Sequence, residues 1–520
     1  MGRKILFVTT DQQRYDSIAC NGGRIAATPT HDPEAAAIVL RRLAAEGVVY
    51  RRAYVPNTEC MPSRATMLTG QHPRTHGVIM NGVPLPLDGP NAARLLQEKA
   101  GYRTALIGKG HFEPSSTPDQ SYFENYAARL GTTGPHRGFE RMELAAHTGR
   151  PGRSMYHYPK WLADEHPDAV DGFFEYIDQN QMPSARGGGD TLAPQVWLNP
   201  IPRGLYHTDW VADRAIAWLD SLPDDADWFL WLSFPDPHHP WDPPAAERAR
   251  HDWRDLDLPP GYPGGPEQAA ALLAKKPRHW LEGYEGRQRF NFSLPPSFVA
   301  AGLTPDQVRE VNAVVHVENE LIDEALGRVL SSVAARGWDR DADVVFTTDH
   351  GEMQGDFGML FKGAWHVDAL MRAPMIWRPA PSAGIAPAEI PEPVGHVNLA
   401  PTFAAIAGVD PDPGFEAPPL PTAPGGGFER AIVTWDDEPG PAAIVLQTLV
   451  TDRYLCTSYD RTDYYSGEEG ELYDLWNDPL QHENLWDDPA RRGLRSDLLA
   501  DLADNLPARR DPPLARIARV

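Results

Sequence analysis

Two short apolar stretches, each followed by Thr-Thr-Asp, constrain the fold of this chain most strongly. The first runs from Ile5 to Val8 and leads to Asp11, and the second runs from Val344 to Phe346 and leads to Asp349. An uninterrupted apolar run of this length is typical of a strand buried on both faces of a parallel sheet. Ligands of such sheets bind beyond the carboxyl ends of the strands, so we expect both Asp side chains at one edge.

These strand ends predict a metal site. Asp11, Asp349 and the adjacent His350 offer carboxylate oxygens and an imidazole, which suit a divalent ion. We rank Ca²⁺ first and keep Mg²⁺ and Mn²⁺ as alternatives. Either Asp taken alone also fits a helix N-cap that follows a strand. The two together favour one shared cation.

The stretch 57–70 predicts a loop that turns into a short helix. Pro62 suits a first helical turn and Gly70 suits the helix end. Cys60 then lies at the helix N-terminus, where free N–H groups favour an anion, and Arg64 lies on the same side four residues later. One interpretation is a nucleophile beside a positively charged pocket. The other is a buried structural Cys with an Arg on the solvent face.

Two more buried strands are predicted over 103–107 and 228–234. Gly-Lys-Gly-His follows the first, which places Lys109 and His111 on one side if the segment is extended. Pro-His-His-Pro follows the second and contains His238, whose titration range suits a proton donor. Without the other motifs, both segments also fit surface turns.

The Cys-Met-Pro-Ser-Arg segment 60–64, followed by Leu-Thr-Gly, resembles the signature of the type I, formylglycine-dependent sulfatases. Gly-Lys-Gly-His at 108–111 is similar to a second signature of that family. The resemblance implies an α/β fold: the alkaline-phosphatase-like three-layer α/β/α sandwich with a small C-terminal antiparallel-sheet subdomain. It also implies that a dedicated maturation enzyme oxidises Cys60 to formylglycine.

The resemblance further implies the roles of individual residues. Gln12 stands where many sulfatases have a second Asp, so it is carried as a metal ligand. Hydrated formylglycine would attack sulfur, and His238, with Lys362, would protonate the leaving alcohol. The implied metal ligands are Asp11, Gln12, Cys60, Asp349 and His350; the catalytic residues are Cys60, Arg64, Lys109, His111, His238 and Lys362; the substrate contacts are Asn81, Lys109, His238 and Lys362.

The predicted function is therefore a sulfatase, a sulfuric ester hydrolase of arylsulfatase-like type, that releases an alcohol and inorganic sulfate. A phosphonate monoester or phosphodiester hydrolase of the same superfamily is the alternative. Those relatives tend to depart from Gly-Lys-x-His, which weighs against them. A binding protein with a retained but inactive site is a third hypothesis.

Composition limits the partners. The net charge of −24 argues against nucleic acid and against an anionic membrane surface. Three Cys form no disulfide framework and suit a reducing compartment, and no apolar run is long enough to span a bilayer, so we expect a cytoplasmic protein. The expected partners are a small-molecule sulfate ester and the maturation enzyme; the sequence is also compatible with a homo-oligomer.

Pro- and Gly-rich stretches suggest the domain organisation. We expect a catalytic α/β domain over 1–425, with irregular, pocket-forming excursions near 131–207 and 241–300. Short strand patterns after residue 430 predict a C-terminal α+β subdomain over 426–520.

Overall fold

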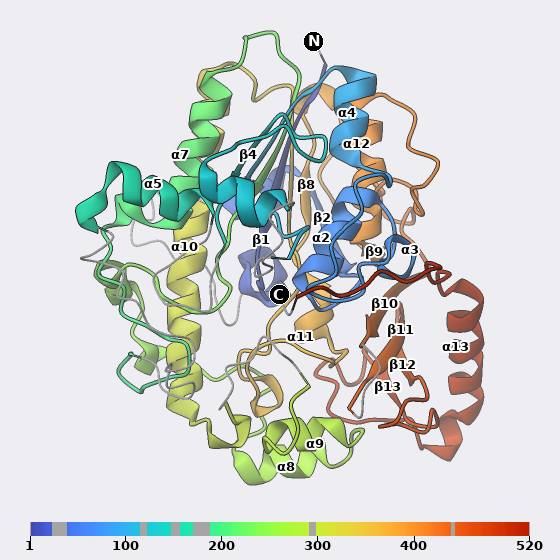
Figure 1. The fold of residues 1–520 in the computed structure, drawn as a ribbon. Helices are drawn as coiled ribbons and strands as arrows, with labels where there is room; N and C mark the ends of the chain where they lie inside the picture. The colour runs from blue at the N-terminus through green and yellow to red at the C-terminus, as the bar shows by residue number, and fades with distance from the viewer. Residues whose placement is uncertain are drawn as a thin grey trace.

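A computed structural model of the chain has a large mixed sheet with helices on both faces and a small second sheet at one side (Figure 1). It describes residues 2–22, 39–114, 122–146, 156–169, 188–290, 298–437 and 442–518. Parts of both predicted excursions lie outside these residues. Among the described residues, no helix is long and apolar enough to cross a membrane.

The large sheet has nine strands in the order β4-β3-β5-β1-β6-β8-β2-β7, with β9 paired to β2. Strand β1 lies between β5 and β6 and is parallel to both, with Thr10 level with Thr348. The carboxyl ends of these central strands therefore meet at one edge. The strands are β1 Lys4–Thr10, β2 Val48–Tyr54, β3 Arg103–Gly108, β4 Arg141–Leu144, β5 Trp228–Ser233, β6 Ala342–Thr348, β7 Arg372–Ala373, β8 Ile376–Arg378 and β9 Ala388–Gly395.

Alternate residues of β1 face two separate cores. Leu6 and Val8 pack in the core that includes helices α1 (Val39–Glu46), α7 (His207–Asp220) and α10 (Pro305–Ala335). Ile5 and Phe7 pack on the opposite face with α2 (Cys60–Thr69), α4 (Ala92–Ala100) and α12 (Leu399–Ala407). Since side chains alternate along a strand, an all-apolar strand needs cover on both sides. The predicted three-layer α/β/α sandwich is confirmed.

The small sheet is antiparallel, with strands β10 (Arg430–Asp436), β11 (Val445–Thr451), β12 (Tyr454–Tyr459) and β13 (Gly470–Asp474) in sequence order. Helix α13 (Arg492–Asn505) covers one face through Leu498 and Leu502. This confirms the predicted C-terminal antiparallel sheet, while the boundary at 425/426 stays a prediction. The other α-helices among the described residues are α3 Pro73–His76, α5 His157–Glu165, α8 Pro266–Leu273, α9 His279–Tyr284 and α11 Asp368–Met371.

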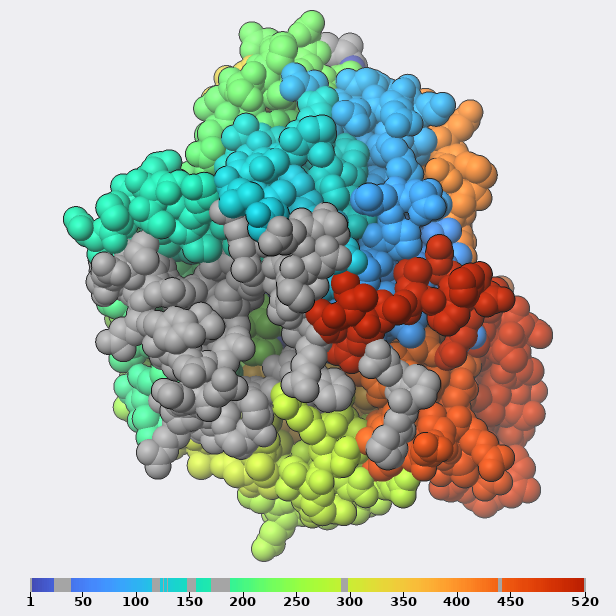
Figure 2. Space-filling view, in the orientation of Figure 1, coloured from blue at the N-terminus to red at the C-terminus, as the bar shows by residue number. Residues whose placement is uncertain are grey.

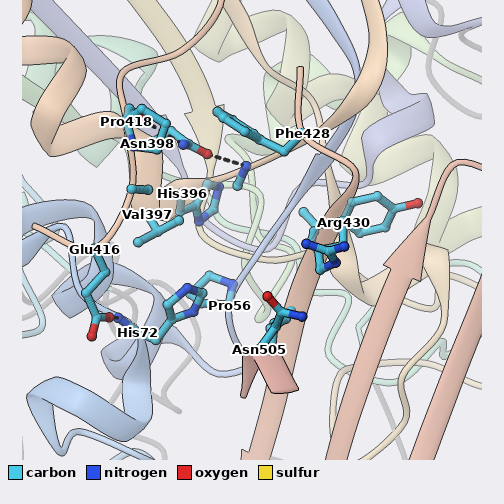
Figure 3. A pocket seen from close by; sticks show the side chains of 15 residues that line it. Pro56, His72, His396, Val397, Asn398, Glu416, Pro418, Phe428, Arg430 and Asn505 are labelled. Atoms are coloured by element: carbon cyan, nitrogen blue, oxygen red, sulfur yellow. Dashed lines mark hydrogen bonds between the residues drawn. The ribbon is translucent and has the colours of Figure 1, made fainter. Parts of the chain in front are cut away.

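A cavity of about 220 Å³ lies where the small sheet meets the large domain. Its lining comes from both parts and includes His396, Glu416, Arg430 and Asn505 (Figure 3). His396 also hydrogen-bonds Ser63 Oγ of α2 through its Nδ1 at 3.0 Å. One residue that lines the cavity, His396, is therefore in direct contact with α2.

The segment after α13 returns across the large domain. The Arg510 N–H donates to the Arg74 carbonyl at 2.7 Å, and the Ile517 N–H donates to the Gly82 carbonyl at 2.9 Å. In the space-filling view this red segment runs along one side of a hollow near the middle of the molecule (Figure 2).

Candidate active site

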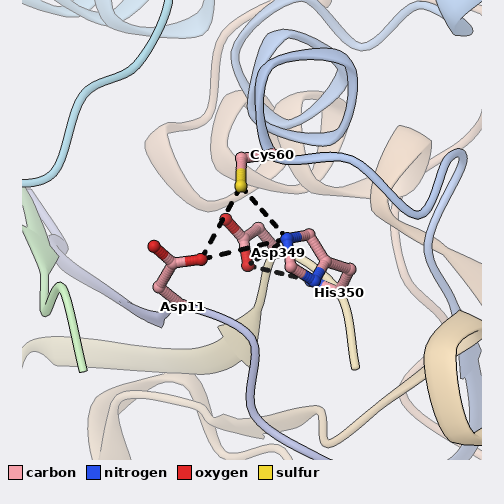
Figure 4. Close-up of side chains that lie close together, drawn as sticks. All are labelled: Asp11, Cys60, Asp349 and His350. Carbon is pink, nitrogen blue, oxygen red and sulfur yellow. Dashed lines mark hydrogen bonds and ion pairs between the residues drawn. The ribbon is translucent and has the colours of Figure 1, made fainter. Parts of the chain in front are cut away.

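Four potential ligand groups converge at the carboxyl edge of the large sheet (Figure 4). Asp11 directly follows β1, Asp349 and His350 directly follow β6, and Cys60 is the first residue of α2. One donor atom from each lies within 4.8 Å of the others, and all four side chains are buried. The register of β1 and β6 explains the convergence, because it places the two strand ends side by side.

Backbone contacts orient two of these groups. His350 Nδ1 lies 3.0 Å from the Gly351 carbonyl, and because a carbonyl only accepts, Nδ1 carries the proton. In the neutral imidazole Nε2 would then be the acceptor nitrogen, and it lies 3.1 Å from Cys60 Sγ. Asp349 Oδ1 accepts from the backbone N–H groups of Gln12 at 3.0 Å and His350 at 2.9 Å. The donor atoms are thus held in place by the protein itself.

The residues at this edge fit a divalent cation. Burial and then the charge of the neighbouring Asp349 raise the pKa of Asp11 to about 6. A cation between the two carboxylates would relieve both effects. Gln12, beside Asp11, has a buried Oε1 without a hydrogen-bond partner among the described residues, as expected of a carbonyl oxygen available to a ligand.

Cys60 is surrounded by positive charge. Lys362 Nζ lies 2.8 Å from Cys60 Sγ and 2.9 Å from His350 Nε2. Lys109, after β3, forms an ion pair with Asp11. Burial raises the pKa of the Cys60 thiol, but Lys109, Lys362 and His350 outweigh it and hold that pKa well below its usual value. Negative charge at this position is therefore strongly favoured.

His238 and its neighbour His239 point to different groups. His238 Nε2 lies 3.4 Å from Lys362 Nζ, and burial together with the Lys362 charge lowers the pKa of His238 to about 4. His239 Nδ1 lies 3.1 Å from Gln12 Nε2, and its ring packs against Phe361. His238 therefore contacts the lysine beside Cys60.

Arg64 does not lie on the solvent face, so that alternative is wrong. Its side chain is fully buried, and Nε donates to Asp349 Oδ2 at 2.8 Å. Nη1 donates to the Lys109 carbonyl and to Ser233 Oγ, both at 2.9 Å. The guanidinium thus ties three strand ends together beneath the ligand groups, since a fixed fork of donors can contact several acceptors at once.

Asn81 and His111 approach Cys60 from two loops. Asn81 Oδ1 accepts from the Met61 N–H at 2.9 Å, so its hydrogen bond serves the start of α2. His111 has a left-handed backbone, with φ of 65°, and burial lowers its pKa to about 4. His111 Nδ1 is buried and unpaired within the described ranges, which leaves a polar atom for a ligand.

Sequence reasoning missed Glu352, which supports this edge. Its Oε2 accepts from Gln12 Nε2, while Oε1 accepts from the backbone N–H groups of Gln354 and Phe361. It therefore joins the strand β1 end to the segment that carries Lys362. Its position two residues after His350 was the only available signal.

Comparisons with known proteins agree with this fold. The sequence model of the sulfatase family, described as Sulfatase, matches residues 3–409. The uncharacterized sulfatase YidJ of Escherichia coli is 26% identical over 515 residues, covering 98% of this chain and 88% of YidJ. Two solved phosphonate monoester hydrolases have a similar fold. The enzyme of Agrobacterium radiobacter has a TM-score of 0.75 and 22% sequence identity, and the match covers 96% of this chain and 95% of that enzyme. The enzyme of Silicibacter pomeroyi has a TM-score of 0.72 and 25% sequence identity, and the match covers 96% of this chain and 94% of that enzyme.

Proposed function

This chain belongs to the sulfatase family, and from that premise we propose that it hydrolyses a sulfate monoester to an alcohol and inorganic sulfate. The observation that carries the proposal is the position of Cys60. Its Sγ lies 3.1 Å from His350 Nε2 and 2.8 Å from Lys362 Nζ, where a nucleophile and the sulfuryl group would meet. Fixed charge of this kind stabilises charge that develops on a transferring group.

We propose that Cys60 acts as formylglycine and that Asp11, Gln12, Asp349 and His350 hold one divalent ion with it. The thiol sulfur then stands in for an oxygen of the hydrated aldehyde. A sulfur ligand is soft, whereas an oxygen completes the hard set that Ca²⁺ or Mg²⁺ prefers. When bound, the cation supplies positive charge beside the nucleophile. The hydrated aldehyde supplies a hydroxyl nucleophile and a second hydroxyl that permits sulfate release.

The other residues divide between holding the sulfuryl group and moving protons. Lys109, paired with Asp11, and Lys362 provide two cationic contacts for sulfuryl oxygens. The leaving oxygen takes its proton from the pair of His238 and Lys362: Lys362 Nζ is the protonated member that donates, and His238 Nε2 lies 3.4 Å from it. His111, with a buried unpaired Nδ1 in the described structure, accepts the proton of the second hydroxyl. We assign Asn81 to positioning, because its hydrogen bond is to the Met61 backbone. Arg64 positions protein groups through Nε and Nη1, while its buried Nη2 is unpaired among the described residues and is available to the site.

A second candidate is hydrolysis of phosphonate monoesters or phosphodiesters. The phosphonate monoester hydrolase of Silicibacter pomeroyi, with a TM-score of 0.72 at 25% identity, favours it. Lys109 and His111, in the Gly-Lys-x-His segment, favour the sulfate ester. We keep sulfate as the main substrate class and the phosphorus esters as side activities.

The remaining parts of the proposal concern partners and place. The substrate is a small-molecule sulfate ester, aryl sulfates being the first to test, and a maturation enzyme converts Cys60. The net charge of −24 supports the absence of nucleic acid and membrane partners. We retain a cytoplasmic protein and a homo-oligomer as proposals.

A substrate panel tests the function. Protein co-expressed with a formylglycine-generating enzyme is assayed on matched sulfate, phosphate diester and phosphonate esters, with peptide mass spectrometry at Cys60 and metal analysis of the same sample. We expect kcat/KM to be highest for a sulfate ester and Cys60 to be converted. A fully unmodified thiol in fully active enzyme would refute the formylglycine, and a preference for phosphonate would favour the second candidate.

A further inference from the structure

A buried carboxylate, Glu124, accepts hydrogen bonds from the loop that carries His111. Its Oε2 accepts from the His111 N–H at 2.6 Å and its Oε1 accepts from the Phe112 N–H at 2.9 Å. The Glu124 side chain has no exposed surface. One carboxyl group thus receives two successive backbone donors directly after Gly-Lys-Gly, and leaving these buried donors unpaired would cost free energy.

The backbone conformation of this loop explains why these hydrogen bonds are needed. His111 has φ of 65°, a conformation that costs a non-glycine residue free energy unless its surroundings hold it. A β-strand or helix ladder does not reach these two N–H groups, so Glu124 pairs donors that burial would otherwise leave unsatisfied. A Cβ added at Gly110 would come within 3.0 Å of Glu124 Oε2, so the loop and the carboxylate are in close contact.

Glu124 is itself held by a second buried carboxylate, Glu113. The Glu124 N–H donates to Glu113 Oε2 at 2.9 Å, and Glu113 Oε1 lies 2.9 Å from His136 Nε2 and 3.0 Å from Arg137 Nη2. Phe123, beside Glu124, stacks on the His136 ring with centroids 4.6 Å apart. Burial and the Glu113 charge raise the pKa of Glu124 to about 8, while its two N–H bonds oppose that rise. These contacts fix where the carboxylate lies.

We propose that Glu124 is a positioning residue that sets the place of the His111 imidazole at Cys60. Among the described residues its hydrogen bonds are to the backbones of His111 and Phe112 and to Glu113, so it acts through the backbone of His111. The inference rests on the proposed function, because it assigns a consequence for turnover to a contact that the structure contains. It predicts that replacing Glu124 lowers kcat only when His111 is present.

A double-mutant cycle tests this dependence. Glu124→Gln keeps the shape but turns an amide N–H₂ group toward a backbone donor, so one of these hydrogen bonds is lost. We expect kcat on an alkyl sulfate to fall by roughly 10²-fold, the size of effect that misplacement of a reacting group causes, with KM changed by less than about 3-fold. In a His111→Ala background the same substitution should change kcat by less than about 3-fold.

A control comes from another buried carboxylate that accepts from two successive backbone donors and, unlike Glu124 in the described part of the chain, also pairs with Arg248 and the Thr191 hydroxyl. Glu310 accepts from the backbone N–H groups of Asp190 at 2.7 Å and Thr191 at 2.8 Å, in a loop without a described contact to the site. Glu310→Gln should lower the melting temperature to a similar degree and leave kcat within about 3-fold of the parent. A loss of kcat equal to that of Glu124→Gln would indicate a general stability effect and overturn the proposal.

Hydrogen exchange separates this inference from the proposed function. The amides of His111 and Phe112 should exchange faster in Glu124→Gln, and those of Asp190 and Thr191 faster in Glu310→Gln, whatever the substrate. If the parent hydrolyses no sulfate ester, the proposed function fails while the exchange result still reports the hydrogen bonds of Glu124. If the parent is active and the kcat losses of Glu124→Gln and His111→Ala multiply, the positioning role is refuted.

Discussion

The buried charges at the carboxyl edge of the large sheet differ from those between α9 and the small sheet. At the first place Lys362 faces Cys60, and the charges of Cys60, Glu59, Asp11 and Asp349 outweigh burial and raise the pKa of Lys362. At the second, Lys276 donates to Tyr473 and the Gln481 carbonyl and lies over three aromatic rings, and burial lowers the pKa of Lys276 to about 8.

The carboxylate beside Lys276 is more fully paired than several polar atoms at the sheet edge. Around Lys276, the Glu471 carboxylate accepts from Trp280 Nε1 and from the hydroxyls of Tyr459 and Tyr473. At the sheet edge, in the part of the chain that the structure describes, Gln12 Oε1 and His111 Nδ1 lack partners. Gln481 Nε2, on the residue whose carbonyl Lys276 contacts, is also buried without a partner among the described residues, so the clearer difference is the pKa of the lysine, which is raised at Lys362 and lowered at Lys276.

Loss of a carboxylate at the sheet edge should give the largest effect. Asp349→Ala removes an expected ligand and the partner of Arg64 Nε, so bound metal and turnover should both fall below detection. Metal analysis and circular dichroism on the purified variant check this. Full metal occupancy in a folded Asp349→Ala protein would contradict the ligand assignment, and Asp349→Asn, which keeps the shape, controls for unfolding.

The next effect should depend on the leaving group. If the contact of His238 with Lys362 supplies the proton, His238→Ala should lose on the order of 10²-fold or more on alkyl sulfates and much less on a nitrophenyl sulfate, which departs nearly unaided. Lys109→Ala is the matched comparison and should damage both alike, since the sulfuryl group must be held in each. If chemistry limits turnover, equal losses of activity for His238→Ala across a leaving-group series would show that His238 only binds sulfate and supplies no proton.

Lys276→Met should lower stability and leave activity nearly unchanged. It removes the cation beside Glu471 without touching the sheet edge, so we expect about 3 kcal/mol of lost stability and kcat/KM within about 3-fold of the parent. Thermal unfolding and the substrate assay on one preparation measure both. A large loss of kcat/KM in stable protein would break the distinction between the two clusters.

The smallest effect is a pH dependence of stability at Lys276. Its pKa is about 8 in the folded protein and 10.5 as an ordinary lysine, so between these values the unfolded chain binds more protons. Stability contributed by this group therefore rises with pH across that window. The melting-temperature difference between the parent and Lys276→Met should be larger at pH 10 than at pH 7. A difference that shrinks with pH would show that Lys276 is held charged.

Strand and helix patterns predicted much of the fold and of the site. The apolar runs before Asp11 and Asp349 predicted buried parallel strands with both carboxylates at one edge, and the structure places them there. Pro62 and Gly70 predicted the start and end of the helix that begins at Cys60. These predictions worked because strand period, helix capping and the position of strand ends are properties of short segments.

The sequence by itself determined which ligand groups follow which strands, whereas the tertiary structure decided which donor meets which acceptor. Arg64 contacts Asp349 from 285 positions away, and Asn81 contacts Met61 from another loop. No periodic sequence pattern predicts the hydrogen bond from the His111 N–H to Glu124. Such pairings are settled only when distant segments pack, because a buried polar group must take whichever partner the folded chain brings within hydrogen-bond distance.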